Sequence, residues 1–286
     1  MSLASALTRC AWTWPHLLSL DAPLVAVLWQ LLFVETLHAR LPAAVTLVMA
    51  LVVWLVYVAD RILDSFGPDE GAAEAVRHRF YREHRMAFMP PFFAILAVAG
   101  WMSYADLGER TRRDGLVLAF AVVAYFCVVH ALKTTARGWF PKEMVVAILF
   151  GIGTFMPVAV RAHGIHASFL LPFLLFILVL WINTLLIEYS EWITLREGLL
   201  DRPHESTVAA GRNLVAFSVV VGALALYAMT SRTFSSAWPI LLAEALSALA
   251  LAALALFWRR ISSYIIRIAA DVTLLTPALL LIALRK

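Results

Sequence analysis

Residues 41–64 read LPAAVTLVMALVVWLVYVADRILD, an apolar stretch that runs directly into two aspartates, Asp60 and Asp64. A helix that rises about 1.5 Å per residue needs roughly 20 apolar residues to cross the hydrocarbon layer of a membrane. Comparable apolar stretches recur along the 286 residues, with no long polar linker between them. The pattern predicts an all-α integral membrane protein that forms a single transmembrane domain over residues 1–286.

The composition argues against a soluble fold. Hydrophobic residues make up 63% of the chain and charged residues 15%, whereas soluble domains have about 45–50% and 25%. The net charge of +4 does not indicate nucleic acid, because membrane proteins collect Lys and Arg in cytoplasmic loops. We therefore expect no nucleic-acid partner. The two cysteines, Cys10 and Cys127, suggest neither a disulfide framework nor a metal cluster.

Hydropathy predicts about nine membrane spans. The third contains Pro90 and Pro91, which predict a bend early in that helix. The nine spans are placed approximately at residues 22–39, 41–59, 87–105, 114–132, 143–161, 167–187, 213–231, 238–257 and 263–284.

Lys and Arg are unequally divided between the two sides of such a bundle. The loops on the N-terminal side carry fourteen of them and the loops on the other side carry eight. The positive-inside rule therefore predicts a cytoplasmic N-terminus in the cell (inner or plasma) membrane. It also places the three longest polar connections, 60–86, 133–142 and 188–212, together in the cytoplasm.

Asp60 and Asp64 are four residues apart and share one face of a continuing helix. Mg²⁺ takes one or two carboxylates together with water and phosphate oxygens, so the pair could form half of a site for a metal-bridged diphosphate. The alternative is a helix that leaves the bilayer and becomes polar, with Arg61 and the arginines of 77–85 as topology anchors. Both interpretations stay open on these residues alone.

A second acidic helix end follows the sixth span. Glu188 and Glu191 are three residues apart, and Asn183 lies about a turn deeper. Carboxylates beside hydrocarbon need partners, water or a metal, although simple solvation at the membrane surface is the alternative. Two acidic helix ends on one side of the bundle favour a shared site.

Basic residues occur with the same spacing. Lys133 and Arg137 follow the fourth span and could bind the oxygens of a leaving diphosphate, or could anchor the helix end as topology signals. In the last predicted span, Arg267 and Asp271 most simply predict an ion pair with each other.

These motifs resemble those of the UbiA superfamily of intramembrane prenyltransferases, which are nine-helix bundles around a central cavity. The family's first motif reads NDxxDxxxD, and Asp60-Arg61-Ile62-Leu63-Asp64 is similar to its second half. Val56 and Tyr57 stand where the family has Asn and Asp. Lys133 matches the lysine of the family's Tyr-x-x-x-Lys element, whose tyrosine is absent here. The second acidic motif is similar in placement only.

The resemblance implies Mg²⁺-dependent transfer of an isoprenyl group from a prenyl diphosphate to a lipophilic, often aromatic, acceptor, in contact with membrane lipids. Mapped by position, it implies catalytic roles for Asp60, Asp64 and Glu191. The metal ligands would be Asp60, Asp64, Glu188, Glu191 and Asp201. The diphosphate contacts would be Arg61, Lys133, Arg137, Asn183 and Arg202.

Other functions remain open. A non-enzymatic relative that binds an isoprenoid or another lipid, or that forms a complex, is favoured by the missing Asn and Asp before Asp60. A transporter would use intramembrane charges such as Glu35, Arg267 and Asp271. The acidic loops gathered on one side fit a reaction chamber better than a transport path.

Overall fold

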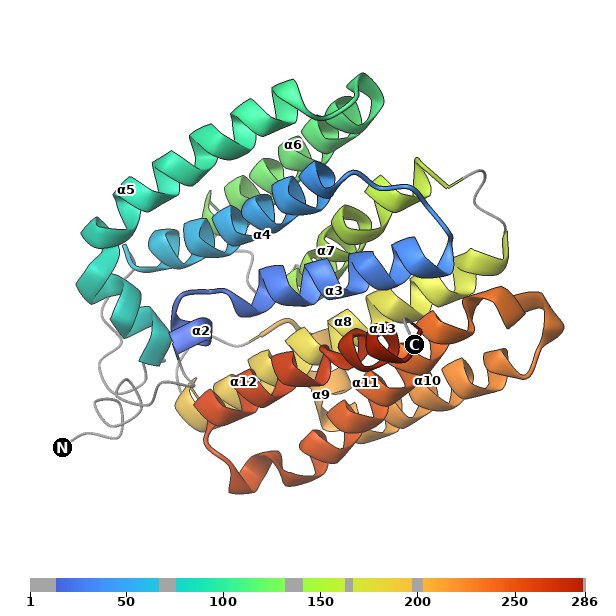
Figure 1. The fold of residues 1–286 in the computed structure, drawn as a ribbon. Helices are drawn as coiled ribbons and strands as arrows, with labels where there is room; N and C mark the ends of the chain where they lie inside the picture. The colour runs from blue at the N-terminus through green and yellow to red at the C-terminus, as the bar shows by residue number, and fades with distance from the viewer. Residues whose placement is uncertain (1–13, 67–75, 132–140, 163–166, 197–202, 285–286) are drawn as a thin grey trace.

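The computed structural model describes residues 14–66, 76–131, 141–162, 167–196 and 203–284, and every regular element in these ranges is helical. Figure 1 shows the helices lying side by side in a bundle. The long helices are α3 (Asp21–Thr36), α4 (Ala43–Asp64), α5 (Val76–Ala105), α6 (Glu109–Ala131), α7 (Lys142–Ala159), α8 (Leu170–Glu191), α10 (Leu214–Met229) and α11 (Trp238–Phe257). The shorter elements are α2 (Trp14–Leu17), η3 (Ala167–Phe169), η4 (Trp192–Arg196), α9 (Glu205–Arg212), η5 (Arg232–Ala237), η6 (Trp258–Arg260), α12 (Ser263–Thr273) and α13 (Thr276–Leu284).

The predicted spans fall on these helices, the last of them on the broken pair α12 and α13. Within the described ranges, six helical segments are long and apolar enough to cross a membrane. The pair α9 and α10, which meets at a bend of 75°, would be a seventh if it counts as one span. Helix α3 has 16 residues and falls short of the usual length. Membrane integration thus agrees with the helices, while the number nine stays a prediction. The six segments are Ala43–Asp64, Arg79–Ala105, Lys142–Ala159, Ala167–Thr194, Arg232–Arg260 and Ser263–Leu284.

Several polar helix ends come together at one end of the bundle. The C-terminal ends of α4 and α8 and the N-terminal ends of α5 and α12 lie at the left in Figure 1. The connections from α3 to α4 and from α5 to α6 lie at the opposite end. Acidic residues that end α4 and α8 are therefore on the same side of the molecule, which is the arrangement that alternating spans require.

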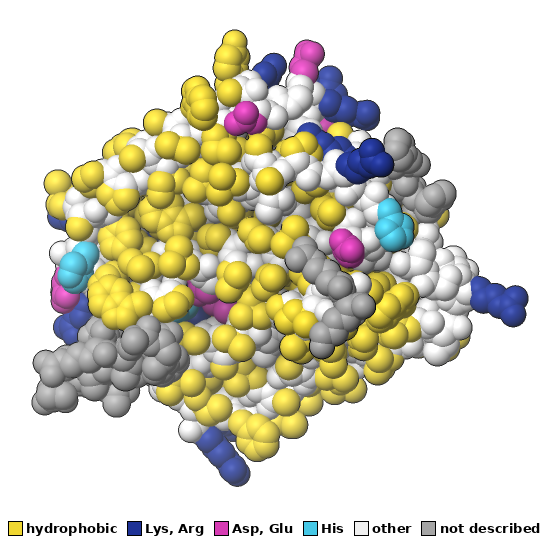
Figure 2. Space-filling model, in the orientation of Figure 1, with side chains coloured by type: hydrophobic (Ala, Val, Ile, Leu, Met, Phe, Trp, Pro, Cys, Tyr) yellow, Lys and Arg dark blue, Asp and Glu magenta, His cyan; other side chains and the backbone are white. Residues whose placement is uncertain are grey.

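The outer helices present apolar side chains to their surroundings. In the apolar stretch of α5 only 6% of the residues are buried inside the protein, whereas in the apolar stretch of α8 the share is 56%. Large exposed residues such as Trp101 on α5 and Phe120 on α6 belong to this surface. Figure 2 shows hydrophobic side chains over most of the visible face. In water such a surface would be unfavourable, whereas hydrocarbon accepts it.

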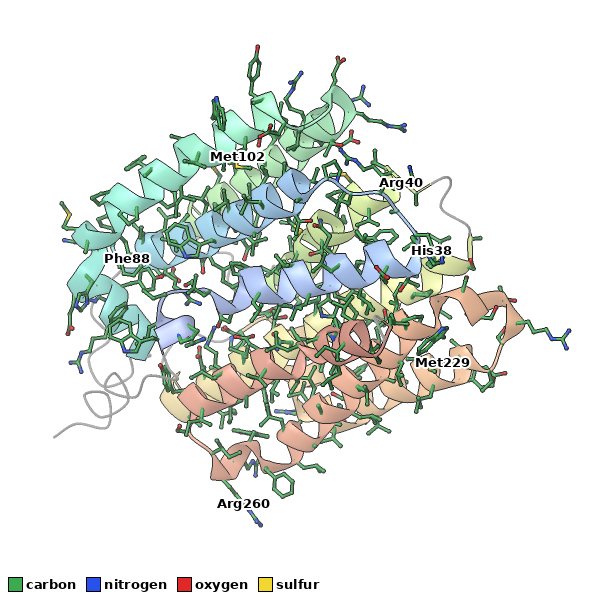
Figure 3. The ribbon with its side chains drawn as sticks, viewed as in Figure 1. His38, Arg40, Phe88, Met102, Met229 and Arg260 are labelled. Atoms are coloured by element: carbon green, nitrogen blue, oxygen red, sulfur yellow. The ribbon has the colours of Figure 1, made fainter. Side chains whose placement is uncertain are left out.

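Helix α5 turns near Phe88, as the side-chain view in Figure 3 shows. Pro90 and Pro91 lie inside the helix just beyond this point. Each proline removes a backbone donor and crowds the preceding turn, which is a common cause of a bend in a continuous helix.

The last helix is interrupted between α12 and α13, and side chains from other helices bind the backbone there. Trp29 is fully buried and donates its indole N–H to the carbonyl of Leu274 at 2.9 Å. Ser247 on α11 donates its hydroxyl to the carbonyl of Thr273 at 2.8 Å. Carbonyls without a partner are costly at membrane depth, so irregular backbone is tolerated where protein groups bind it.

The packing of α9 on α8 yields a test of the fold. A methyl group at Gly211 would overlap the ring of Tyr189, which is buried and lies edge-on to Trp258 at 5.7 Å. We expect Gly211→Ala to destabilise the protein by about 1–3 kcal/mol because the ring has little room to move. Thermal unfolding of the purified protein in detergent measures this loss.

Gly100→Ala on α5 is the matched control, because no atom lies within 4 Å of the added methyl. Alanine is favoured over glycine inside a helix by about 0.5–1 kcal/mol, so this variant should unfold at the wild-type temperature or slightly above it. Equal unfolding temperatures for the two variants would contradict the close approach of α9 and α8.

Candidate functional site

The predicted acidic motifs face a common region of the bundle. The hydroxyl of Tyr125, on α6, interacts electrostatically with Asp60 and Asp64 of α4, with Glu143 of α7 and with Glu188 of α8. Carboxylates from three helices thus act electrostatically on one hydroxyl. The predicted contacts and ligands Lys133, Arg137, Asp201 and Arg202 lie outside the described residues.

Both glutamates at the end of α8 contact basic side chains of other helices. Glu188 Oε1 lies 3.1 Å from Lys142 Nζ at the start of α7. Glu191 Oε1 accepts a hydrogen bond from Arg267 Nε at 2.8 Å, and both of these side chains are largely buried. Ion pairs therefore connect the end of α8 to the start of α7 and to the first half of α12.

The two residues of the predicted pair Arg267 and Asp271 each contact another element. Arg267 reaches across to Glu191, while Asp271 lies near His16, with 3.9 Å between Asp271 Oδ2 and His16 Nδ1. Helix α12 packs against α8, which brings the buried Glu191 within reach of Arg267. The ion pair between Arg267 and Asp271 stays a prediction.

Glu143 is an acidic residue of the site to which the sequence prediction assigned no role, although Lys142-Glu143 is similar to the start of the family's fifth helix. It is buried, and Thr207 of α9 donates its hydroxyl to Glu143 Oε2 at 2.9 Å. The signal available was weak, because an acidic residue in the first turn of a helix is common for reasons of the helix dipole. The contact brings α9 against the start of α7.

Arg61, a predicted diphosphate contact, lies inside the protein with 5% of its surface exposed. Its Nε donates to Ser19 Oγ at 2.8 Å, and the Tyr81 hydroxyl lies 3.1 Å from the same oxygen. Trp54 donates its indole N–H to the carbonyl of Leu18 at 3.0 Å. The segment before α3 is thereby bound to α4 and α5, and it covers the end of the bundle where Arg61 lies.

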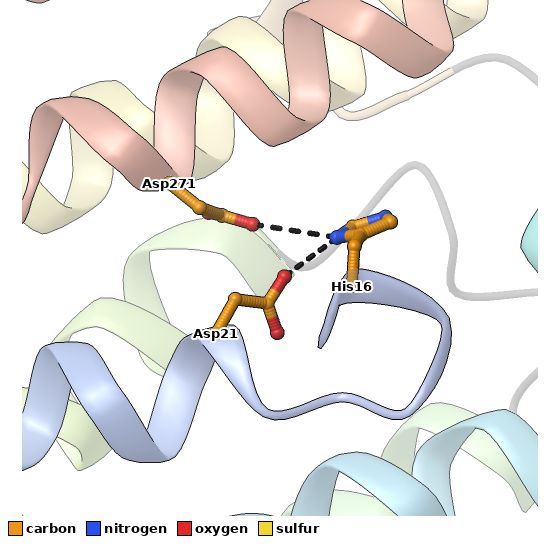
Figure 4. A group of neighbouring side chains, drawn as sticks. All are labelled: His16, Asp21 and Asp271. Carbon is orange, nitrogen blue, oxygen red and sulfur yellow. Dashed lines mark hydrogen bonds and ion pairs between the residues drawn. The ribbon is translucent and has the colours of Figure 1, made fainter. Parts of the chain in front are cut away.

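Three residues far apart in the sequence form a compact polar cluster, shown in Figure 4. His16 Nδ1 lies 2.6 Å from Asp21 Oδ2, and Asp271 approaches from α12. The side chain of His16 is 3% exposed, that of Asp21 16% and that of Asp271 23%. The sequence did not predict a site at His16 and Asp21, because no motif spacing connects them with Asp271 near the other end of the chain.

A small cavity lies beside this cluster. It is open at its mouth and has room for only about one or two water molecules. Its polar lining comes from Tyr57, Asn183, Thr184 and Asp271, and its apolar lining from Ala22, Val25, Val146, Ala147, Phe150, Leu180 and Leu274. Binding pockets for small molecules have this composition, with a few polar groups among apolar walls.

Two residues of the cavity connect it to the predicted motifs. Asn183 is 4% exposed, and its side-chain nitrogen has no hydrogen-bond partner within the part of the chain that the structure describes. The hydroxyl of Tyr57 interacts electrostatically with Asp271, Asp21, Arg61 and Asp60. Charges of the His16 cluster and of the acidic end of α4 therefore both act on this residue of the cavity wall.

Comparison of the chain with protein-family models, with curated proteins and with solved structures finds no match. The likeness to the UbiA superfamily therefore rests on the motifs quoted above.

The ion pair between Glu191 and Arg267 can be tested by a double-mutant cycle. Arg267→Met removes the counter-ion from a buried carboxylate, so we expect a loss of stability on the order of 3 kcal/mol. Adding Glu191→Met should restore much of it, because no buried charge of the pair remains. Thermal unfolding in detergent measures the four proteins of the cycle.

The exposed pair Arg79 and Glu83, with 54% and 62% of their side-chain surfaces accessible, serves as the control. Arg79→Met should change stability by less than about 1 kcal/mol. If Arg267→Met is equally mild, or if the double variant is the sum of the single ones, the pair does not join α12 to α8 energetically.

Proposed function

We propose that this chain is a divergent intramembrane prenyltransferase of the UbiA type with about nine spans. It would transfer an isoprenyl group from a prenyl diphosphate to a lipophilic acceptor in the cell membrane, with its N-terminus and acidic loops in the cytoplasm. The observation that carries the proposal is that the acidic ends of α4 and α8 lie at one end of the bundle (Figure 1), where their carboxylates act electrostatically on the hydroxyl of Tyr125. A cavity with apolar walls lies next to them.

The donor atoms near the end of α4 suit Mg²⁺. Asp60 and Asp64 offer carboxylate oxygens from one helix face, and Mg²⁺ prefers oxygen ligands completed by water and phosphate. We assign the metal to this pair, whose spacing is similar to the first acidic motif of the UbiA superfamily. Bound Mg²⁺ would supply Lewis-acid stabilisation of the diphosphate oxygens.

Basic side chains would bind the remaining charge of the diphosphate. Arg61 is next to Asp60 in the chain and its Nε donates to Ser19, whereas Lys142 at the start of α7 is held by Glu188 of α8. Cations fixed in this way stabilise the negative charge that develops as the allylic C–O bond breaks and its electron pair leaves with the diphosphate. Lys133, Arg137 and Arg202 belong to the same proposal as further contacts.

The apolar wall of the cavity would contact the reacting end of the prenyl group. Val25, Phe150 and Leu180 line it, and such walls exclude water from a carbocation-like centre. The acceptor then attacks this carbon, a new bond forms, and the acceptor loses a proton. Asn183 and Tyr57 are placed to orient polar atoms of either substrate at the cavity wall.

A second function is supported by the ion pairs of α8. Because Lys142 and Arg267 already engage Glu188 and Glu191, the second acidic motif is balanced by protein charges. A relative that binds an isoprenoid without reacting it would retain such internal pairing. Binding without turnover is the result that separates this function from the first.

The first function predicts Mg²⁺-dependent release of diphosphate. Purified protein is incubated with labelled geranylgeranyl or farnesyl diphosphate and a membrane lipid extract. Asp60→Asn combined with Asp64→Asn should lower the rate at least about a hundred-fold, because the charged ligands that hold the metal at the leaving group are lost.

Asp106→Asn is the control, since this exposed aspartate lies in the connection from α5 to α6 at the other end of the bundle. It should retain the wild-type rate. Turnover that survives in the double variant would remove Asp60 and Asp64 from the mechanism. Tight binding of the labelled diphosphate with no release would establish the non-enzymatic alternative.

A further inference from the structure

We propose that His16, Asp21 and Asp271 form a binding site for a divalent transition-metal ion such as Zn²⁺ or Mn²⁺. This site is separate from the Mg²⁺ site assigned to Asp60 and Asp64. One ligand atom from each of the three residues lies within 4.8 Å of the others. Ligands about 2.0–2.2 Å from a tetrahedral ion are roughly 3.3–3.6 Å apart, so small side-chain rotations would close the site around an ion.

The donor set selects the class of metal. One imidazole nitrogen and two carboxylates suit Zn²⁺ or Mn²⁺, because imidazole binds transition ions well. Mg²⁺ prefers an all-oxygen shell that includes several waters, and the His16 ring does not provide this. The cluster therefore differs in chemistry from the aspartate pair at the end of α4.

Neighbouring groups hold two of the ligands in place. The Asp21 carboxylate accepts a hydrogen bond at Oδ1 from the backbone N–H of Ala22 at 3.0 Å, which leaves Oδ2 directed at His16. The His16 ring packs edge-on against the Tyr264 ring with 5.7 Å between the centroids. Outer contacts of this kind orient the ligands of metal sites in proteins.

An independent observation in the adjoining cavity points to a ligand. Asn183 lines the same cavity as Asp271, is almost fully buried, and has a side-chain nitrogen without a partner among the described residues. A buried polar group without a hydrogen-bond partner is costly, so we expect a polar group of a ligand to bind Asn183 in this cavity. Rotation of the amide by half a turn exchanges nitrogen for oxygen, which allows either a donor or an acceptor to face it.

The cavity also gives the proposed ion an open coordination position. Sites with three protein ligands keep a further position for water or substrate. Asp271 belongs both to the cluster and to the cavity wall, so this position would face Asn183 and Tyr57. The site would thus connect the segment before α3 to α12 and present the metal to the interior of the bundle.

A cluster without metal is the competing arrangement. A protonated His16 could balance the two carboxylates, and Arg61 adds a further positive charge that acts on Asp21. In that arrangement the three residues form only an ion-paired junction between α3 and α12. Metal binding measured directly on the full chain decides between the two.

The test uses Co²⁺ alone as a spectroscopic probe. Purified full-length protein in detergent is stripped with EDTA and titrated with Co²⁺, whose visible absorption strengthens when nitrogen and carboxylate ligands replace water. We expect saturation at one ion per chain, displacement by Zn²⁺, and no displacement by a hundred-fold excess of Mg²⁺. His16→Gln and Asp271→Asn should each weaken binding at least about ten-fold.

Two controls accompany these variants. His38→Asn should bind Co²⁺ as the wild type does, because His38 is exposed and has a φ of 50°, which asparagine tolerates. Asp60→Asn with Asp64→Asn should also keep the Co²⁺ spectrum, even if it abolishes release of diphosphate. If that variant loses the Co²⁺ spectrum, Asp60 or Asp64 takes part in binding this ion, and the proposal of two separate sites is overturned.

X-ray absorption by the Zn²⁺-loaded wild type gives an answer that does not depend on folded variants. The signature of one imidazole together with oxygen ligands supports the site. An all-oxygen shell, or less than half an ion bound per chain at saturation, overturns it and leaves the ion-paired junction.

Discussion

Acidic side chains inside an apolar bundle must be balanced, and this requirement organises one end of the protein. A carboxylate removed from water loses several kcal/mol of solvation unless charge or hydrogen bonds replace it. Glu191 is paired with Arg267. Glu143 accepts a hydrogen bond from the hydroxyl of Thr207, and the carboxylate of Asp21 contacts the ring nitrogen of His16. Each of these contacts joins two different elements. The same interactions that neutralise the carboxylates therefore also hold the helix ends together.

The interruption of the last helix belongs to the same design. Asp271 lies three residues before Leu274, where α12 has ended and the backbone is bound by Trp29 and by Ser247 of α11. Because α12 ends inside the bundle, an aspartate near its end can face the cavity while its helix remains apolar on the outer side. The cavity and the His16 cluster both lie beside the break between α12 and α13. Asp271, close to this break, therefore contributes to the cavity and to the cluster.

The proposed function rests on the region between α4, α6, α7 and α8. Asp60, Asp64, Glu143 and Glu188 act on the hydroxyl of Tyr125, and Tyr57 connects Asp60 with Asp271. An apolar cavity next to such a concentration of carboxylates and basic residues suits a substrate that is charged at one end and hydrophobic at the other. Prenyl diphosphates have this character, and so do other lipids with anionic heads.

Hydropathy along the chain was sufficient to locate the helices and to place the ends of α4 and α8 on one side. Burial of apolar segments is a local property that adds up residue by residue, and alternating spans fix the side on which each loop lies. Hydropathy did not predict which charged side chains pair with one another. Arg267 and Asp271 are one turn apart, yet Arg267 binds Glu191 and Asp271 faces His16. Only tertiary structure decides these pairings, because ion pairs and metal sites depend on distances between helices that a linear pattern does not contain.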